Sequence, residues 1–128
     1  MSNATMHVGL ADFAEPTLLI LGDVGSLNWL ADRIESRQSL DFAAALFVRL
    51  LSVSLLLEPT EGDGGFSRQG AKFIWKISLS ESQKFVEQLR ALAASEVPAH
   101  AYLDAIANSA GVEVIASKGE YSTDAFIP

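Results

Sequence analysis

Twice along this chain a short apolar run leads directly into an amphipathic helical pattern, and this repeated transition is the feature that most constrains the fold. The first run, PTLLILGD at 16–23, is bounded by a proline and a glycine and has the length of a strand. Asp23 or Ser26 is the expected N-cap of the helix that follows. The apolar stripe of that helix recurs at helical spacing: Leu27, Leu30, Ala31 and Ile34.

The second transition joins AKFIWKISL at 71–79 to the clearest helix of the sequence. The strand places Phe73, Trp75 and Ile77 on one face. Ser80 and Gln83 form an S-x-x-Q pattern that predicts a capping box at the helix start, and Pro98 ends the helix. Its apolar stripe consists of Phe85, Val86, Leu89, Leu92 and Ala93.

The segment between the two units is harder to assign. Apolar residues alternate with serine towards its end, which favours a strand over about 46–57. The preceding stretch DFAAALFVRLL is either a buried helix or the start of a long strand, because periodicity does not separate the two in a short apolar run. EPTEGDGGFSRQG at 58–70 contains four glycines and a proline and predicts a loop. The strands on either side of this loop could form a hairpin.

Beyond the second helix, HAYLDAI, the turn ANSAG and VEVIASKGEY predict a C-terminal β-hairpin. The expected order is therefore β-α-β followed by β-α-β-β. This order predicts an α+β fold, a two-layer sandwich in which two helices cover one face of an antiparallel-rich sheet. Residues 6–128 are expected to form one domain, and residues 1–5 look like an expression remnant ahead of a natural start at Met6.

Charge and composition exclude several classes of function. The formal net charge is −7, the isoelectric point is near 4.6, and the nine basic residues are scattered, so we expect no nucleic-acid binding. The acidity serves solubility or forms a face for a basic protein partner. No apolar run reaches the ~20 residues of a membrane span. Cysteine is absent, and no secretory signal is visible, so the cytoplasm is the expected location.

His100 is the main candidate for acid–base chemistry, because His7 is expected in a mobile N-terminal segment. In a strand, His100, Tyr102 and Asp104 would project from one face as a row that holds a ligand or relays a proton. The same row could instead be a hydrogen-bonded structural patch. Glu120 and Tyr121 either tie down the C-terminal tail or form an interface rim, where tyrosine is favoured.

The familiar catalytic motifs are missing from the sequence. It contains no nucleophile elbow, no phosphate-binding glycine loop and no metal-ligand spacing. We therefore expect no catalytic residues, no metal and no cofactor.

Two segments resemble known proteins. The ending H-x-Y-L-D, V-x-V, S-x-x-E-Y within residues 98–121 resembles a group of small bacterial proteins that have no assigned activity. LLILGDVGSLNWLADRI at 18–34 is similar to the opening of an immunity-protein family of bacterial polymorphic toxin systems. This second resemblance implies a protein that neutralises a toxin by covering it.

Two functions follow as hypotheses. The first is a non-enzymatic protein-binding domain, for instance an immunity-type inhibitor with a basic partner. The second is a small-molecule binder or minor enzyme that uses His100, Tyr102 and Asp104 beside Glu120 and Tyr121. The chain is expected to be a monomer, or a homodimer paired through a sheet edge.

Overall fold

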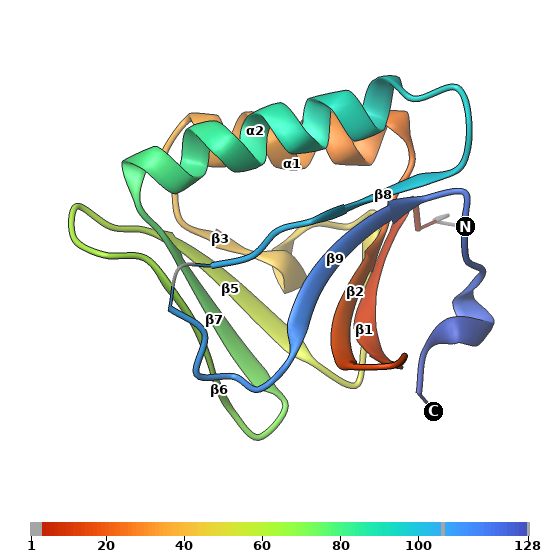
Figure 1. Ribbon diagram of the computed structural model, residues 1–128, viewed down its shortest axis with the longest axis horizontal. Coiled ribbons are helices and arrows are strands. Elements are labelled where there is room, and N and C mark those ends of the chain that lie inside the picture. The colour runs from red at the N-terminus through yellow and green to blue at the C-terminus, as the bar shows by residue number, and fades with distance from the viewer. Residues whose placement is uncertain (1–3, 106, 128) are drawn as a thin grey trace.

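The computed structural model describes residues 4–105 and 107–127, in which two helices lie over two β-sheets (Figure 1). The helices are α1 (Val24–Glu35) and α2 (Leu79–Ala94). The five-stranded sheet has the order β4 (Val48–Leu51), β1 (Met6–Asp12), β2 (Pro16–Leu21), β9 (Glu113–Lys118), β8 (Ala99–Tyr102). The four-stranded sheet has the order β3 (Leu40–Asp41), β5 (Ser54–Pro59), β7 (Lys72–Ile77), β6 (Gly65–Gln69). Short 3₁₀ turns are η1 (Phe42–Ala44) and η2 (Thr123–Ala125).

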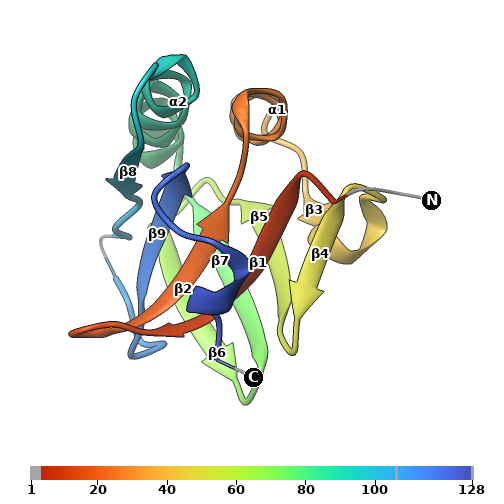
Figure 2. The same cartoon turned by 90° about the vertical axis from the view of Figure 1, so that its right-hand side faces the viewer.

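The helices run side by side along one side of the two sheets (Figure 2). Both sheets contain parallel and antiparallel pairs, with antiparallel pairs in the majority. The predicted α+β class with two helices on one face is therefore confirmed. Among the described residues, neither helix has the length and apolar character that a bilayer crossing requires.

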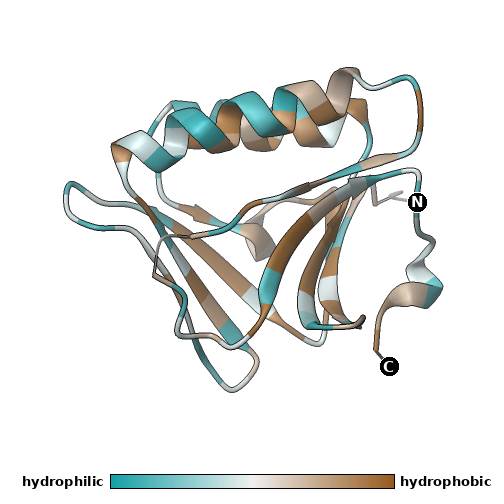
Figure 3. Ribbon diagram, in the orientation of Figure 1, coloured by the Kyte–Doolittle hydropathy of each residue, from teal (hydrophilic) through white to brown (hydrophobic). Residues whose placement is uncertain are grey.

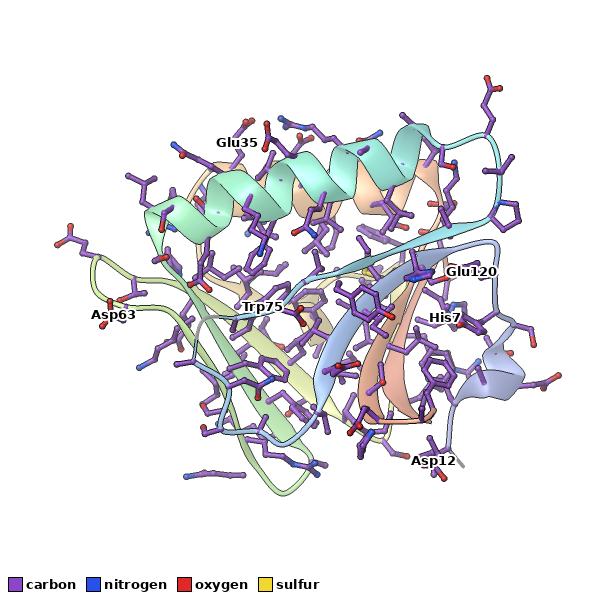
Figure 4. All side chains as sticks on the ribbon, viewed as in Figure 1. His7, Asp12, Glu35, Asp63, Trp75 and Glu120 are labelled. Carbon is purple, nitrogen blue, oxygen red and sulfur yellow. The ribbon has the colours of Figure 1, made fainter. Side chains whose placement is uncertain are left out.

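A single large apolar core fills the space between the helices and the sheets. Figure 4 places Trp75 in the middle of the molecule, where its ring contacts Phe66 and Phe85 at centroid distances of 6.4 and 5.4 Å. Figure 3 shows that the strands facing this space are largely apolar, whereas much of the outer helix surface is hydrophilic. Each large side chain removed from water in this way contributes about 1.5–3 kcal/mol.

Helix α1 begins as its sequence predicts. The Asp23 side chain accepts from the Ser26 amide at 2.8 Å, and the Ser26 hydroxyl accepts from the Asp23 amide at 2.9 Å. This reciprocal capping box satisfies two backbone donors that the first helical turn leaves without partners. The predicted stripe of Leu27, Leu30, Ala31 and Ile34 is buried.

Helix α2 begins two residues earlier than the predicted cap. Ser78 rather than Ser80 is the N-cap, and Glu81 rather than Gln83 completes the capping box. The two patterns overlap in the sequence, and burial decides between them. Strand β7 ends at the buried Ile77, so the next residue, with extended backbone angles, is the first one able to cap the helix.

The strand predicted over about 46–57 is two strands that belong to different sheets. Strand β4 ends at Leu51, Ser52 adopts a left-handed φ of 63°, and β5 begins at Ser54. The residues 40–50, left open between helix and strand, form β3, the 3₁₀ turn η1 and most of β4. The turn at Ser52 allows β4 to join the five-stranded sheet and β5 to join the four-stranded sheet.

The predicted hairpin across residues 58–70 is wrong. Strands β5 and β7 pair in parallel, and the loop that separates them contains the additional strand β6. Strand β6 pairs antiparallel with β7 and places Phe66 in the core, stacked on Phe73 at 5.5 Å between ring centroids. Burial of this ring outweighs the loop preference of the surrounding glycines.

The N-terminal segment is also ordered, contrary to the prediction that His7 is mobile. His7 lies in β1, which pairs with β2 on one side and β4 on the other. Met6 and Val8 in this strand are fully buried. The alternation of Met6, Val8 and Leu10 is the sequence signal that could have predicted it.

Candidate functional site

The C-terminal hairpin borders a cleft on the face of the five-stranded sheet that is turned away from the main core. Strands β8 and β9 pair antiparallel, as predicted, and β9 pairs in parallel with β2. We call the hollow of about 580 Å³ on this face the hairpin cleft. Its floor and walls include Phe13, Thr17, Tyr102, Glu113, Ile115 and Tyr121.

Strand register determines which side chains share the cleft. Thr17 is the register partner of Glu113, and Tyr102 is the register partner of Ile115. Register partners on neighbouring strands project from the same face. Thr17 and Ile115 are 1% and 7% exposed and form a buried floor, whereas the Tyr102 side chain stands at its edge, 46% exposed.

The predicted row of three residues lines the cleft together. His100 and Tyr102 are on β8, with ring centroids 5.3 Å apart in an edge-to-face arrangement. Asp104 lies two residues beyond the end of β8 and lines the same hollow. The period of two in an extended chain, which predicted this shared face, continues past the last ladder pair.

The two residues predicted near the chain end also reach this region. Glu120 Oε1 lies 2.6 Å from His100 Nδ1, with side chains 25% and 39% exposed respectively. Tyr121 lines the cleft, and its ring contacts Phe13 at a centroid distance of 5.0 Å. A left-handed turn at Gly119, with φ of 80°, leads from β9 into this segment.

Lys118 has a structural role beside these residues. Its ammonium group donates to the carbonyl oxygens of Ala93, at 2.8 Å, and Ser95. A cation at this position satisfies carbonyl groups at the C-terminal end of α2 and complements the helix dipole. Lys118 therefore fixes the hairpin against the helix and does not line the cleft.

The sequence did not predict every residue of the cleft, and those it missed include Phe13, Glu15 and Glu113. Phe13 and Glu15 belong to the bend between β1 and β2, which comes to this site because β2 lies beside β9. Glu113 alternates with the apolar residues of β9, and that alternation was the available signal.

The charge of the cleft is strongly negative. Glu15, Asp104 and Glu113 line it, and among the described residues their carboxylates form no side-chain hydrogen bond or ion pair. His100 is the one residue with a basic side chain in the described lining, and it contacts Glu120. Such a surface is complementary to a cation.

The arrangement offers limited means for covalent chemistry. Ser117 is the register partner of His100, but it is fully buried and its hydroxyl donates to the Ala99 carbonyl at 3.4 Å. A nucleophile needs exposure to a substrate as well as a nearby base. In the described part of the chain, no group of three or more histidine, aspartate or glutamate side chains is placed to bind a metal ion.

The second histidine lies in a different hollow on the same sheet. His7 and Arg49, from β1 and β4, line it together with Asp124 and Phe126 of the C-terminal segment. Partial burial and the positive charge of Arg49 lower the pKa of His7. His7 and His100 are therefore in separate sites.

Comparison with known proteins assigns no family. No protein-family model matches the chain, and no curated protein sequence matches it. The crystal structure of Drosophila Suppressor of Fused is similar over 88% of this chain and 26% of that chain, with a TM-score of 0.48 and 12% sequence identity. The present chain thus spans about a quarter of the length of that structure.

Proposed function

We propose that this chain is a non-enzymatic domain that binds a basic protein partner through the hairpin cleft. The supporting observation is that Glu15, Asp104 and Glu113 have no cationic partner within residues 4–105 and 107–127. They line the same hollow as the exposed rings of Tyr102 and Tyr121. Complementary charge accelerates encounter and selects partners, and tyrosine is enriched in protein interfaces. The net charge of −7 acts in the same direction and disfavours nucleic acid.

In its specific form, the proposal is that the protein is an immunity-type inhibitor. This form is suggested by the resemblance of residues 18–34 to the opening of an immunity-protein family. In this role the protein would cover a basic toxin in the cytoplasm and act as a monomer or a homodimer. Binding itself would be the function, so no reaction is required of His100.

A small ligand is the second candidate, because His100, Tyr102 and Asp104 together line a hollow of about 580 Å³, and ligand pockets measure roughly 300–1,000 Å³. His100, Tyr102 and Asp104 would then orient the ligand, with Glu120 fixing the His100 ring. A chemical-fragment screen in which His100→Ala abolishes binding but preserves the fold would favour this candidate over the first.

Two double variants test the protein-binding proposal. The first variant, Glu15→Lys with Asp104→Lys, reverses the charge of two cleft side chains. The second, Glu61→Lys with Asp63→Lys, reverses the charge of two side chains in the exposed β5–β6 loop. Figure 4 shows Asp63 of this loop on the opposite side of the molecule from Glu120. Each exchange adds two charges, so both variants change the net charge from −7 to −3. All four positions are exposed, and both variants are expected to fold.

The measurement is affinity capture from a lysate of the native host at low salt and at about 0.5 M salt. We expect the wild type and the loop variant to retain the same basic protein, and the cleft variant to lose it. The captured protein should also dissociate at high salt. Retention of that protein by the cleft variant at wild-type level would contradict the proposal.

A further inference from the structure

The occupant of the hairpin cleft meets a buried floor, aromatic walls and carboxylates that form no ion pair with any described residue. Thr17 and Ile115 exclude water from the floor, and Phe13 and Tyr121 form one wall with their rings inclined by 30°. A compact inorganic cation would need several ligands converging on one point, and the described residues provide no such group. The occupant therefore combines positive charge with a flat or apolar surface.

From this combination we infer that the hairpin cleft receives an arginine side chain of the basic partner, an inference that rests on the proposed function. A guanidinium group is planar, stacks on aromatic rings and can donate two parallel hydrogen bonds to one carboxylate. Its aliphatic stem covers an apolar floor such as Ile115. An ammonium group is compact and strongly hydrated, so lysine gains less from the same walls.

The individual roles follow from position. The carboxylates that accept from the guanidinium are Glu113, at the start of β9 beside the floor, and Asp104, opposite the start of that strand. Tyr102 and Tyr121 are the rings that select a planar cation, because both are exposed by more than 40%. Glu120 contacts His100 instead, and this contact holds the Tyr102 side of the cleft in place.

Three synthetic peptides test the selectivity without the partner. They alternate glycine with arginine, with lysine, or with citrulline, which has the shape of arginine but no charge. NMR titration of the isotope-labelled full chain reports binding at the resonances of Tyr102, Ile115 and Tyr121. We expect the arginine peptide to shift these resonances with an affinity at least threefold higher than that of the lysine peptide. The citrulline peptide should leave them unchanged.

Replacement of Tyr102 and Tyr121 by serine in one variant provides the second arm. Both side chains are exposed, so the fold should be retained. The double variant should bind the arginine peptide at least fivefold more weakly than the wild type does. Its affinities for the arginine and lysine peptides should be nearly equal. The loop variant Glu61→Lys with Asp63→Lys leaves the cleft unchanged and should retain the arginine-to-lysine affinity ratio of the wild type.

Equal arginine and lysine affinities in the wild type, shifts outside the cleft, or binding of the citrulline peptide would overturn the inference. None of these results would contradict the proposed function, because the capture experiment tests binding of a basic partner independently. Conversely, arginine-selective shifts in the cleft, together with a captured partner that ignores cleft reversal, would refute the proposed function and leave the arginine site standing.

Discussion

Gly64 leaves room for Glu81 and for the chain at the start of α2, because glycine has no side chain. A Cβ atom at this position would lie 1.8 Å from Glu81 Oε1 and 2.8 Å from the backbone oxygen of Lys76. Glu81 is 4% exposed and completes the capping box with Ser78, so it has little room to move. We expect Gly64→Ala to lower the free energy of unfolding by about 1–3 kcal/mol, measured by urea denaturation.

Gly62, two residues earlier in the same loop, is the matched control. A Cβ atom there would meet nothing closer than Thr60 Oγ1 at 3.8 Å. Gly62→Ala should leave the stability unchanged or raise it by up to about 1 kcal/mol, because alanine restricts the unfolded chain. If both alanine variants had the same stability, the steric argument would be wrong.

At the scale of elements, Arg90 joins the two helices. Its guanidinium on α2 donates to Glu35 on α1 at 2.9 and 3.0 Å and to Asp32 at 2.8 Å. The hydrogen bond from Arg90, and then its charge, lower the pKa of Glu35. Because the folded-state pKa lies below the unfolded-state pKa, the pair stabilises the fold above the unfolded-state pKa. This contribution is lost as the pH falls through the folded-state pKa.

We therefore expect Arg90→Gln to raise the pKa of the Glu35 carboxyl group in an NMR titration. About 0.5 M salt should reduce the difference in Glu35 pKa between the wild type and the variant, because the side chains of Arg90 and Glu35 are largely exposed and their interaction is screened. Lys84→Gln removes a charge from an exposed position on the same helix and is the control. An identical Glu35 titration in wild type and Arg90→Gln would contradict the assigned cause.

At the scale of the whole molecule, the C-terminal segment closes part of the outer sheet face. Phe126 forms a bridge with Ala11 on β1, and the Ile127 amide donates to the Leu10 carbonyl at 2.8 Å. The Phe126 ring contacts the backbone at Gly9, where a Cβ atom would lie 2.7 Å from Cδ1. Figure 2 shows this segment crossing in front of β1 and β2. The tail thereby covers an apolar patch beside the hairpin cleft.

Phe126→Ala should lower the free energy of unfolding by about 2–4 kcal/mol, because a buried ring is lost from a site that only partly collapses. Ile127→Ala removes an apolar side chain that is 47% exposed and should cost less than about 0.5 kcal/mol. Thermal and urea unfolding of both variants provide the measurement. A Phe126→Ala protein as stable as the wild type would show that the tail is a passive cover.

Local patterns in the sequence determined both helices and the C-terminal hairpin. The spacing of Leu27 and Leu30, and of Phe85 and Leu89, requires a helix in any context that buries one face. The period of two along an extended chain likewise places His100, Tyr102 and Asp104 on one face, whichever strand lies beside them. These features depend on residues within one or two turns of each other.

Only the tertiary structure decided the partners of each element. Packing between distant residues determines three features: the parallel pairing of β5 with β7, the turn at Ser52 and the insertion of Phe66 into the core. The cleft likewise needs Phe13 from the β1–β2 bend and Tyr121 from the tail, more than 100 positions apart in the chain. Such contacts form because burial of apolar surface is summed over the whole molecule, and no local pattern records that sum.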